Sequence, residues 1–239
     1  MYDKISEEYD IFFSKKDEYV KDVNGILNIY GKLPKSPVFL DYGCGTGGHI
    51  EYLLETIDCK IVCFDVSKEM LKFTKKKLSK HEDNIIFIEH FEDLKNYTYD
   101  CIFSLFYVVN HFQSLDDWED FTSLYECLND NGKFIFDYWN YDLAIIDPPV
   151  SYEREESFSK FPHIKKCTAS LDHENITMDY EIYDLKKENL ILKTRLDMKL
   201  WKEDFMKKYF KDQDIDILGK NFNDRDVDRS YHKIIVVNK

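Results

Sequence analysis

The sequence lacks the features that mark membrane-spanning, secreted and zinc-binding proteins. No run approaches the ~20 consecutive apolar residues that a membrane helix requires, and the first residues, MYDKISEEYDIFF, lack the basic and apolar regions of a signal peptide. The six cysteines form no C-x-x-C pair and the seven histidines no H-x-x-x-H pair, so a metal site has little support. We therefore expect a cytoplasmic protein with reduced, mostly buried thiols, no metal and no membrane partner.

Positive charge is also in short supply. Lys and Arg total 33 against 46 for Asp and Glu, which gives a net charge of −13. A nucleic-acid partner would require a concentrated basic patch. The richest basic run is KFTKKKLSK (72–80), and apolar residues in and just before it follow helical spacing, so its lysines are interpreted as the solvated face of a helix. We expect no nucleic-acid partner.

Apolar residues are abundant enough for a large core. Of the 239 residues, 44% are apolar and 16% aromatic, which argues against global disorder. The length fits one large domain or one domain with an elaborated cap. Residues 1–34 are expected to form a helical N-terminal cap, because apolar clusters recur along them before the breaker-rich link KLPKSP (32–37).

Between residues 35 and 148, apolar strand-like segments alternate with amphipathic helical segments. The predicted helices are 49–57, 67–78 with Ser67 as N-cap, and 116–128. The predicted strands are 38–42, 60–66, 84–90, 100–106 and 133–139. This alternation predicts an α/β fold with a doubly wound, Rossmann-like, mostly parallel seven-stranded sheet, covered by helices on both faces. In such sheets ligands bind beyond the carboxyl ends of the strands.

After Pro148 and Pro149 the apolar pattern changes to a two-residue alternation. ITMDYEIYDL (176–185) and LILKTRLDMKLW (190–201) are predicted strands, and KKEN between them is a predicted hairpin turn. Residues 149–201 are therefore expected to form an antiparallel meander added to the parallel sheet after its fifth strand. It would serve as a lid, a substrate platform or a homodimer contact. Residues 202–239 are expected to supply a helix and two strands that complete the core sheet.

The glycines after the first strand, in DYGCGTGGHIEYL, point to a cofactor. Gly43, Gly45 and Gly48 satisfy G-x-G-x-x-G, a weak signal for a dinucleotide. Asp41 argues against a dinucleotide, because a carboxylate there would repel a pyrophosphate but would suit an ammonium group. With Gly47 the pattern becomes D-x-G-x-G-x-G, which resembles the first motif of class I S-adenosylmethionine-dependent methyltransferases. This cofactor carries an ammonium, a sulfonium and a carboxylate but no phosphate, and a glycine turn lets the backbone approach it closely.

The resemblance covers residues 38–140 and implies a set of cofactor contacts. Asp65 ends the second strand, where an acidic side chain can accept both ribose hydroxyls. Val66 and Met70 would flank the adenine, and His90 stands where family members usually carry an Asp that contacts the adenine amino group. The other positions that the resemblance assigns to the cofactor are Asp41, Gly43, Cys44, Gly45, Gly47, Phe91, Ser104 and Leu105. Tyr19 lies before this range, and the second resemblance, described next, implies that it binds the cofactor carboxylate.

Segments outside the cofactor motifs resemble N-methyltransferases that act on nucleotide-linked amino sugars. These segments are EEYDIFFSKKDEYV, VVNHF and LWKEDFMKKYF. The resemblance implies that Tyr9 and His111 face the methyl acceptor. His111 could take the proton that an amine nucleophile must lose. Tyr138, Trp139 and Asn140 end the fifth strand at the ligand edge and are candidate substrate contacts.

Other readings of the acceptor remain open. O-methylation of a sugar or glycan precursor and N-methylation of a small free amine such as glycine fit the same motifs, as does a catalytically silent cofactor-binding subunit. DPPV (147–150) follows the fifth strand and lacks an aromatic residue, so the adenine-N6 methylation of DNA is disfavoured. The expected partner is a small-molecule substrate.

Overall fold

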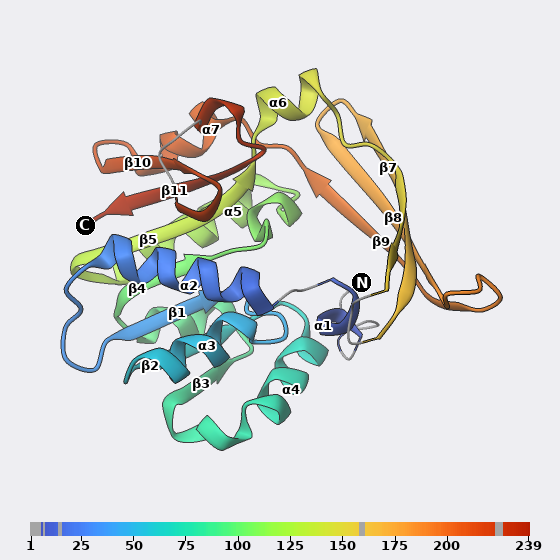
Figure 1. Ribbon diagram of the computed structural model, residues 1–239. Coiled ribbons are helices and arrows are strands. Elements are labelled where there is room, and N and C mark those ends of the chain that lie inside the picture. Colours follow the sequence, from blue (N-terminus) through green and yellow to red (C-terminus); the bar gives the residue numbers. More distant parts are fainter. Residues whose placement is uncertain (1–5, 7, 14–15, 158–160, 223–226) are drawn as a thin grey trace.

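The computed structural model describes residues 6, 8–13, 16–157, 161–222 and 227–239. Its strands form two separate sheets, one of seven strands and one of four. Figure 1 shows the four-stranded sheet standing beside the larger sheet, with the short helix α1 (Tyr9–Phe12) between them. The predicted class, a doubly wound and mostly parallel seven-stranded sheet with an antiparallel insertion, is confirmed.

The seven-stranded sheet has the order β10-β11-β5-β4-β1-β2-β3. Its first five strands along the chain pair in parallel, and the two C-terminal strands pair antiparallel with their neighbours. The strands are β1 (Val38–Tyr42), β2 (Lys60–Phe64), β3 (Ile85–Ile88), β4 (Tyr99–Ser104), β5 (Leu128–Trp139), β10 (Asp214–Gly219) and β11 (His232–Asn238). The strand order reverses between β1 and β4, which is where sheets of this kind bind ligands.

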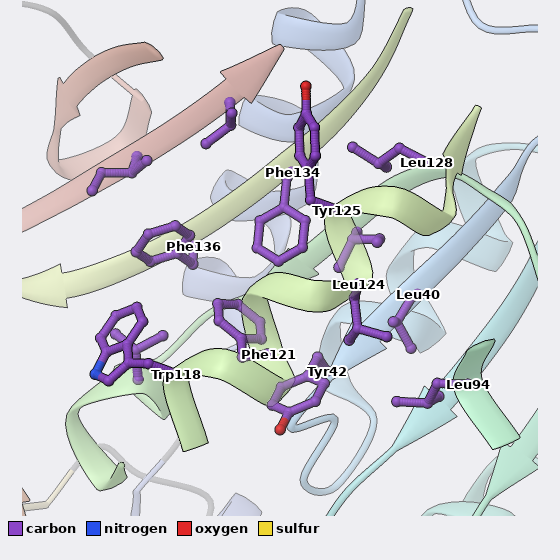
Figure 2. Packing of buried hydrophobic residues seen from close by; sticks show 14 of the residues in the cluster. Leu40, Tyr42, Leu94, Trp118, Phe121, Leu124, Tyr125, Leu128, Phe134 and Phe136 are labelled. Carbon is purple, nitrogen blue, oxygen red and sulfur yellow. The ribbon is translucent and has the colours of Figure 1, made fainter. Parts of the chain in front are cut away.

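Helices cover both faces of this sheet. On one face α2 (Lys16–Tyr30), α3 (Gly48–Thr56) and α4 (Lys68–Lys77) bury an apolar cluster that includes Ile26 and Ile50. On the other, α5 (Leu115–Ser123) and α7 (Glu203–Lys207) bury a cluster rich in aromatic rings, part of which Figure 2 shows. Because successive strand residues point to opposite faces, neighbours such as Phe39 and Leu40 belong to different clusters.

Several strand ends differ from the prediction; β3, for example, ends at Ile88 instead of residue 90. β2 ends at Phe64 and β4 at Ser104, two residues earlier than the sequence indicated, because the chain turns there toward the ligand edge. β5 begins at Leu128 rather than at residue 133, and its pairing with β4 shifts register between Tyr99 and Cys101. A bulge of this kind lets a strand run through a segment whose residues favour a turn.

The predicted meander is present, but it forms a sheet of its own instead of extending the parallel sheet. Its strands, in chain order and all antiparallel, are β6 (Tyr152–Glu156), β7 (His163–Asp172), β8 (Asn175–Tyr183) and β9 (Leu190–Lys199). The reason is that β11 pairs with the outer edge of β5 over its whole length, so the meander that follows β5 along the chain cannot pair with it. Buried Ile176 and Met198 pack instead against Trp139 and Tyr141.

The N-terminal helices connect the two sheets. Helix α1 lies against the second sheet, because Lys165 of β7 donates a hydrogen bond to the Phe12 carbonyl (2.8 Å), and the ring of Phe13 lies 5.1 Å from that of Tyr180. Helix α2 packs on α3 of the core, where a Cβ on Gly48 would come within 2.3 Å of the Tyr19 ring. Among the described residues, no helix has the length and apolar character needed to cross a bilayer.

Candidate active site

Two adjoining cavities lie at the carboxyl ends of the parallel strands. The larger, about 400 Å³, is lined by the glycine turn and the ends of β1 and β2. The smaller, about 270 Å³, is lined by the core on one side and the second sheet on the other. Three residues line both cavities: Tyr9, Phe106 and His111. The two predicted acceptor-facing residues therefore lie where the cavities meet.

The glycine turn forms one wall of the larger cavity. Gly43 and Gly45 have φ angles of +84° and +50°, in the left-handed region that favours glycine. A Cβ on Gly43 would lie 2.6 Å from a methyl group of Val108, whereas a Cβ on Gly45 would have no heavy atom within 4 Å. The backbone at Gly45 is thus open to a ligand in the cavity.

Asp65 joins this turn to the second strand. Its carboxylate accepts the N–H of Gly45 at 2.8 Å through one oxygen and the N–H of Ser67 at 2.8 Å through the other. Ser67 in turn caps α4 by accepting the N–H of Met70 (3.2 Å), which confirms the predicted N-cap. Asp65 is buried and lines the cavity.

Asp41 lies buried beneath the turn and outside the cavity lining. It is 1% exposed, and one carboxylate oxygen has no hydrogen-bond partner among the described residues. Burial raises the pKa of the Asp41 carboxyl to about 7, against the opposing influence of His49. A buried acceptor without a donor is costly unless a cation or a proton satisfies it, which fits the ammonium group expected here.

Apolar and aromatic side chains form the rest of the larger cavity. The rings of Tyr42 and Phe64 lie 5.0 Å apart. The predicted Met70 and Val66 both line the cavity, the first buried and the second 84% exposed. The other lining residues of this kind are Tyr19, Cys44, Leu105, Val108 and Phe112. A flat, apolar ring system such as adenine fits such a lining.

Four predicted cofactor residues besides Asp41 lie outside the lining. Gly47 has a φ of +73° and begins α3 as its N-cap. His90 is exposed and precedes the turn Phe91–Asn96. The ring of Phe91 lies 6.4 Å from that of Phe64, and buried Ser104 donates a hydrogen bond to the Tyr42 carbonyl (2.8 Å). These residues shape the elements beneath and beside the cavity.

Two buried residues at the site were not found from the sequence. His49 lines the larger cavity and Asp22 the smaller, and His49 Nε2 lies 3.4 Å from an Asp22 carboxylate oxygen. The Tyr19 ring packs at 4.9 Å on His49 and at 5.2 Å on Phe106. His49 directly follows the glycine turn in the sequence, so its position could have indicated that it lies at the site. Asp22 could not have been found in this way, because it looks like any polar residue of an amphipathic helix.

The smaller cavity combines aromatic, apolar and charged side chains. Of the three predicted substrate contacts, Trp139 lines it. Tyr138 is buried and donates a hydrogen bond to Glu203 (2.7 Å), and Asn140 donates one to the Ser230 carbonyl (3.1 Å), so both lie outside the lining. The second sheet contributes Lys165, Met178, Tyr180, Thr194, Leu196 and Met198. The remaining charged or titratable lining residues are Glu18, Asp22, Lys220 and His232.

His111 and Tyr9 approach the junction from different elements. His111 ends the turn η4 (Val108–His111), and its Nδ1 lies 3.2 Å from the carbonyl oxygen of Asp197 on β9. Because a carbonyl can only accept, Nδ1 carries the proton in this contact. Burial holds the pKa of His111 below its usual value. Burial also raises the pKa of Tyr9, so the imidazole is neutral and the phenol protonated near neutral pH.

Comparison by sequence identifies a domain within the chain. Residues 39–132 match the family described as "Methyltransferase domain". An uncharacterized protein of Haemophilus influenzae is 31% identical over 111 residues, which cover 43% of this chain. The match spans about two fifths (42%) of that relative's length.

Comparison by structure extends over almost the whole chain. A crystal structure of an S-adenosylmethionine-dependent methyltransferase from Clostridium acetobutylicum has a TM-score of 0.77 and 19% identity, covering 99% of this chain and 98% of its own. The sugar N-methyltransferase KedS8 from a Streptoalloteichus species has a TM-score of 0.72 and 14% identity, covering 97% and 92%. Residues 39–132 are thus similar in sequence to a methyltransferase domain, and the chain as a whole shares its fold with the S-adenosylmethionine-dependent methyltransferase from Clostridium acetobutylicum.

Proposed function

We propose that this protein transfers a methyl group from S-adenosyl-L-methionine to a nitrogen of a small molecule, an amino sugar carried by a nucleotide. The observation that carries the proposal is the meeting of two cavities at Tyr9, Phe106 and His111. One cavity has the glycine turn and acidic residue expected for the cofactor, and the other is a separate space for an acceptor. The reaction would take place where they join.

The larger cavity has a group for each part of the cofactor. Asp65 would hold the ribose hydroxyls, and the backbone at Gly45 would lie against the methionyl part. Asp41 would balance the ammonium group from below, Tyr19 would bind the carboxylate, and the apolar wall at Phe64 would hold the adenine. When bound, S-adenosylmethionine supplies an electrophilic methyl group on a sulfonium, which a nucleophile can take by direct displacement.

At the junction the protein would orient the acceptor and remove its proton. An amine must lose a proton during methylation, and the neutral imidazole of His111 would accept it at Nε2, because Nδ1 donates to the Asp197 carbonyl. The protonated Tyr9 hydroxyl would orient the amine by a hydrogen bond. Holding the reacting atoms in line supplies up to ~7–11 kcal/mol of the barrier reduction.

The polar lining of the smaller cavity and the likeness to KedS8 support an amino sugar as the acceptor. Glu18, Asp22 and Lys220 offer charged contacts to a polyhydroxylated or cationic molecule, and a purely apolar acceptor could not use these contacts. Trp139 and Tyr180 offer flat surfaces on which a sugar ring can pack.

The test is methyl transfer from labelled S-adenosylmethionine to a panel of acceptors. The panel pairs nucleotide-linked amino sugars with the corresponding hydroxyl sugars, and it includes glycine. We expect labelling of an amino sugar and no labelling of its hydroxyl counterpart. Labelling of the hydroxyl sugar would instead establish O-methylation. Cofactor binding without transfer to any acceptor would favour a catalytically silent subunit.

A further inference from the structure

The chain has an unusual backbone conformation at the wall between the two cavities. Phe106 and Tyr107 follow each other with φ angles of +64° and +63°, in the left-handed region that non-glycine residues rarely adopt. Phe106 lines both cavities and Tyr107 lines the smaller one. Two such residues in succession persist only where the surrounding structure holds them.

The carboxylate of Asp137 holds this turn. One of its oxygens accepts the N–H of Phe106 at 2.9 Å, and the other accepts the N–H of Tyr107 at 2.7 Å. Asp137 belongs to β5, is 1% exposed and does not line either cavity. A buried carboxylate that accepts two backbone N–H groups forms strong, charge-assisted hydrogen bonds, so it fixes both peptide groups of the turn.

His232 compensates the charge of Asp137. Its Nε2 lies 2.8 Å from the same carboxylate oxygen that binds Phe106, and its side chain is 12% exposed. The Asp137 carboxylate raises the pKa of His232, against the effect of burial; Asp22 raises this pKa further and Lys220 lowers it. An uncompensated buried carboxylate is strongly destabilising, and the raised pKa of His232 favours a positive charge on the imidazole beside Asp137.

The turn held by Asp137 leads directly into the segment that carries His111. Tyr107 is the N-cap residue of η4, whose last residue is His111. Asn110 anchors the same segment: it donates a hydrogen bond to the Lys199 carbonyl (2.8 Å) and accepts the N–H of Trp139 (3.0 Å). The position of His111 therefore depends on Asp137 at one end and on Asn110 at the other.

We propose that Asp137, with its charge balanced by His232, is a positioning residue for methyl transfer: it holds the Phe106–Tyr107 wall, and through it His111, in place. This inference rests on the proposed function. Asp137 touches no cavity, so it acts through the backbone that it binds. A small displacement of groups around a reaction centre lowers the rate far more than it lowers ligand affinity.

The test is Asp137→Asn, which keeps the shape of the side chain but has one acceptor oxygen. The carboxamide oxygen can accept only one of the two backbone N–H groups, from Phe106 or from Tyr107. The NH₂ group then faces the other N–H group, and both are donors. We expect kcat to fall by about 10²-fold, with nearly unchanged affinity for S-adenosylhomocysteine. The matched control is Asp100→Asn at the opposite end of β4. Asp100 also accepts two hydrogen bonds, from the Val38 N–H (2.8 Å) and the Asn129 side chain (2.9 Å). This control should lower thermal stability without lowering kcat of the folded protein.

A second readout does not depend on knowing the acceptor. The amides of Phe106 and Tyr107 should exchange hydrogen faster in Asp137→Asn than in the wild type, and not in Asp100→Asn. His232→Gln, a milder change in case Asp137→Asn fails to fold, should accelerate the same amides and lower kcat less.

The two proposals fail in different ways. A wild-type protein that methylates no acceptor would refute the proposed function, while the exchange comparison still tests the role of Asp137. Unchanged exchange at residues 106 and 107, unchanged kcat in Asp137→Asn, or an equal loss of kcat in the Asp100 control would overturn the positioning role.

Discussion

The Asp65 carboxylate binds the glycine turn and lines the larger cavity, where we propose that the cofactor binds. We expect Asp65→Ala to weaken S-adenosylhomocysteine binding by about 10- to 100-fold, because each hydrogen bond to a charged group contributes ~1.5–3 kcal/mol. Isothermal titration calorimetry measures this affinity. Asp93→Ala, at an exposed position outside the cavity, is the control and should bind as the wild type does. Equal affinity in the Asp65 variant would contradict the ribose role.

Asp41 makes the stability of the ligand-free protein depend on pH. In the unfolded chain its carboxyl ionises near pH 3.8, whereas in the folded protein burial keeps it protonated up to about pH 7. The folded state binds more protons over this window, so this residue's contribution to the free energy of unfolding falls as pH rises through it.

Asp41→Asn should therefore raise the thermal midpoint at about pH 8 and change it little at about pH 4. At the same time it should weaken cofactor binding, because the ammonium group loses its counter-charge. Differential scanning calorimetry at the two pH values, with and without S-adenosylhomocysteine, separates the two effects. A variant that is no more stable than the wild type at the higher pH would contradict this role for Asp41. So would a variant that binds S-adenosylhomocysteine as tightly as the wild type does.

Protonation of His111 should cause the decrease of kcat at acidic pH. Burial lowers its pKa, so the neutral base persists to a lower pH than for an exposed histidine, and kcat should fall as pH drops through that lowered pKa. His111→Gln should reduce kcat by about 10²- to 10⁴-fold and remove this dependence while leaving S-adenosylhomocysteine affinity intact. His173→Gln, at an exposed turn, should keep the wild-type profile. An acidic limb that survives in His111→Gln would assign the proton transfer to another group.

Among the secondary-structure elements, the short helix α1 depends on contacts with a distant part of the chain. Lys165 of β7 donates to the Phe12 carbonyl, and its Nζ lies 4.2 Å from the Phe13 ring centroid and 5.0 Å from that of Tyr180. A helix of four residues is not stable without such contacts. Lys165 thus helps to place Tyr9, which belongs to the same helix, at the junction.

Lys165→Met should release α1 from the second sheet while the core stays folded. We expect a higher KM for the acceptor and faster amide exchange in residues 8–13, with a smaller effect on S-adenosylhomocysteine affinity. Lys166→Met is the matched control, because the neighbouring side chain is exposed. Equal KM values in the two variants would show that the Lys165 contacts do not organise the acceptor cavity.

The end of β4 shows what residue patterns alone cannot predict about an element. The residue pattern predicts a strand over residues 100–106, yet the strand stops at Ser104. The turn that follows exists because Asp137, about thirty residues later, accepts both of its backbone N–H groups. Local preference disfavours this conformation, so the sequence of the turn itself contains no signal for it.

At the level of the whole molecule, the smaller cavity exists because the chain builds two sheets. β11 covers the edge of β5, so the meander stands apart and faces the core across a gap that side chains from both partly fill. In Figure 1 α6 (Tyr141–Ile146) leads from β5 to this second sheet. If the meander had extended the parallel sheet, as the sequence suggested, no second sheet would face the carboxyl end of β5.

The cofactor half of the molecule could be predicted from the sequence, since its signals are local. Strand periodicity, the glycines of the turn and an acid at the end of the next strand are each contained in a short segment. The acceptor half depends on residues that come together from distant segments, such as Asp22, Asp137 and His232. Trp139 lines the cavity whereas Tyr138 and Asn140 do not, because adjacent strand residues point to opposite faces and the strand ends at Trp139. Which of them lines the smaller cavity depends on the packing of the second sheet against the first.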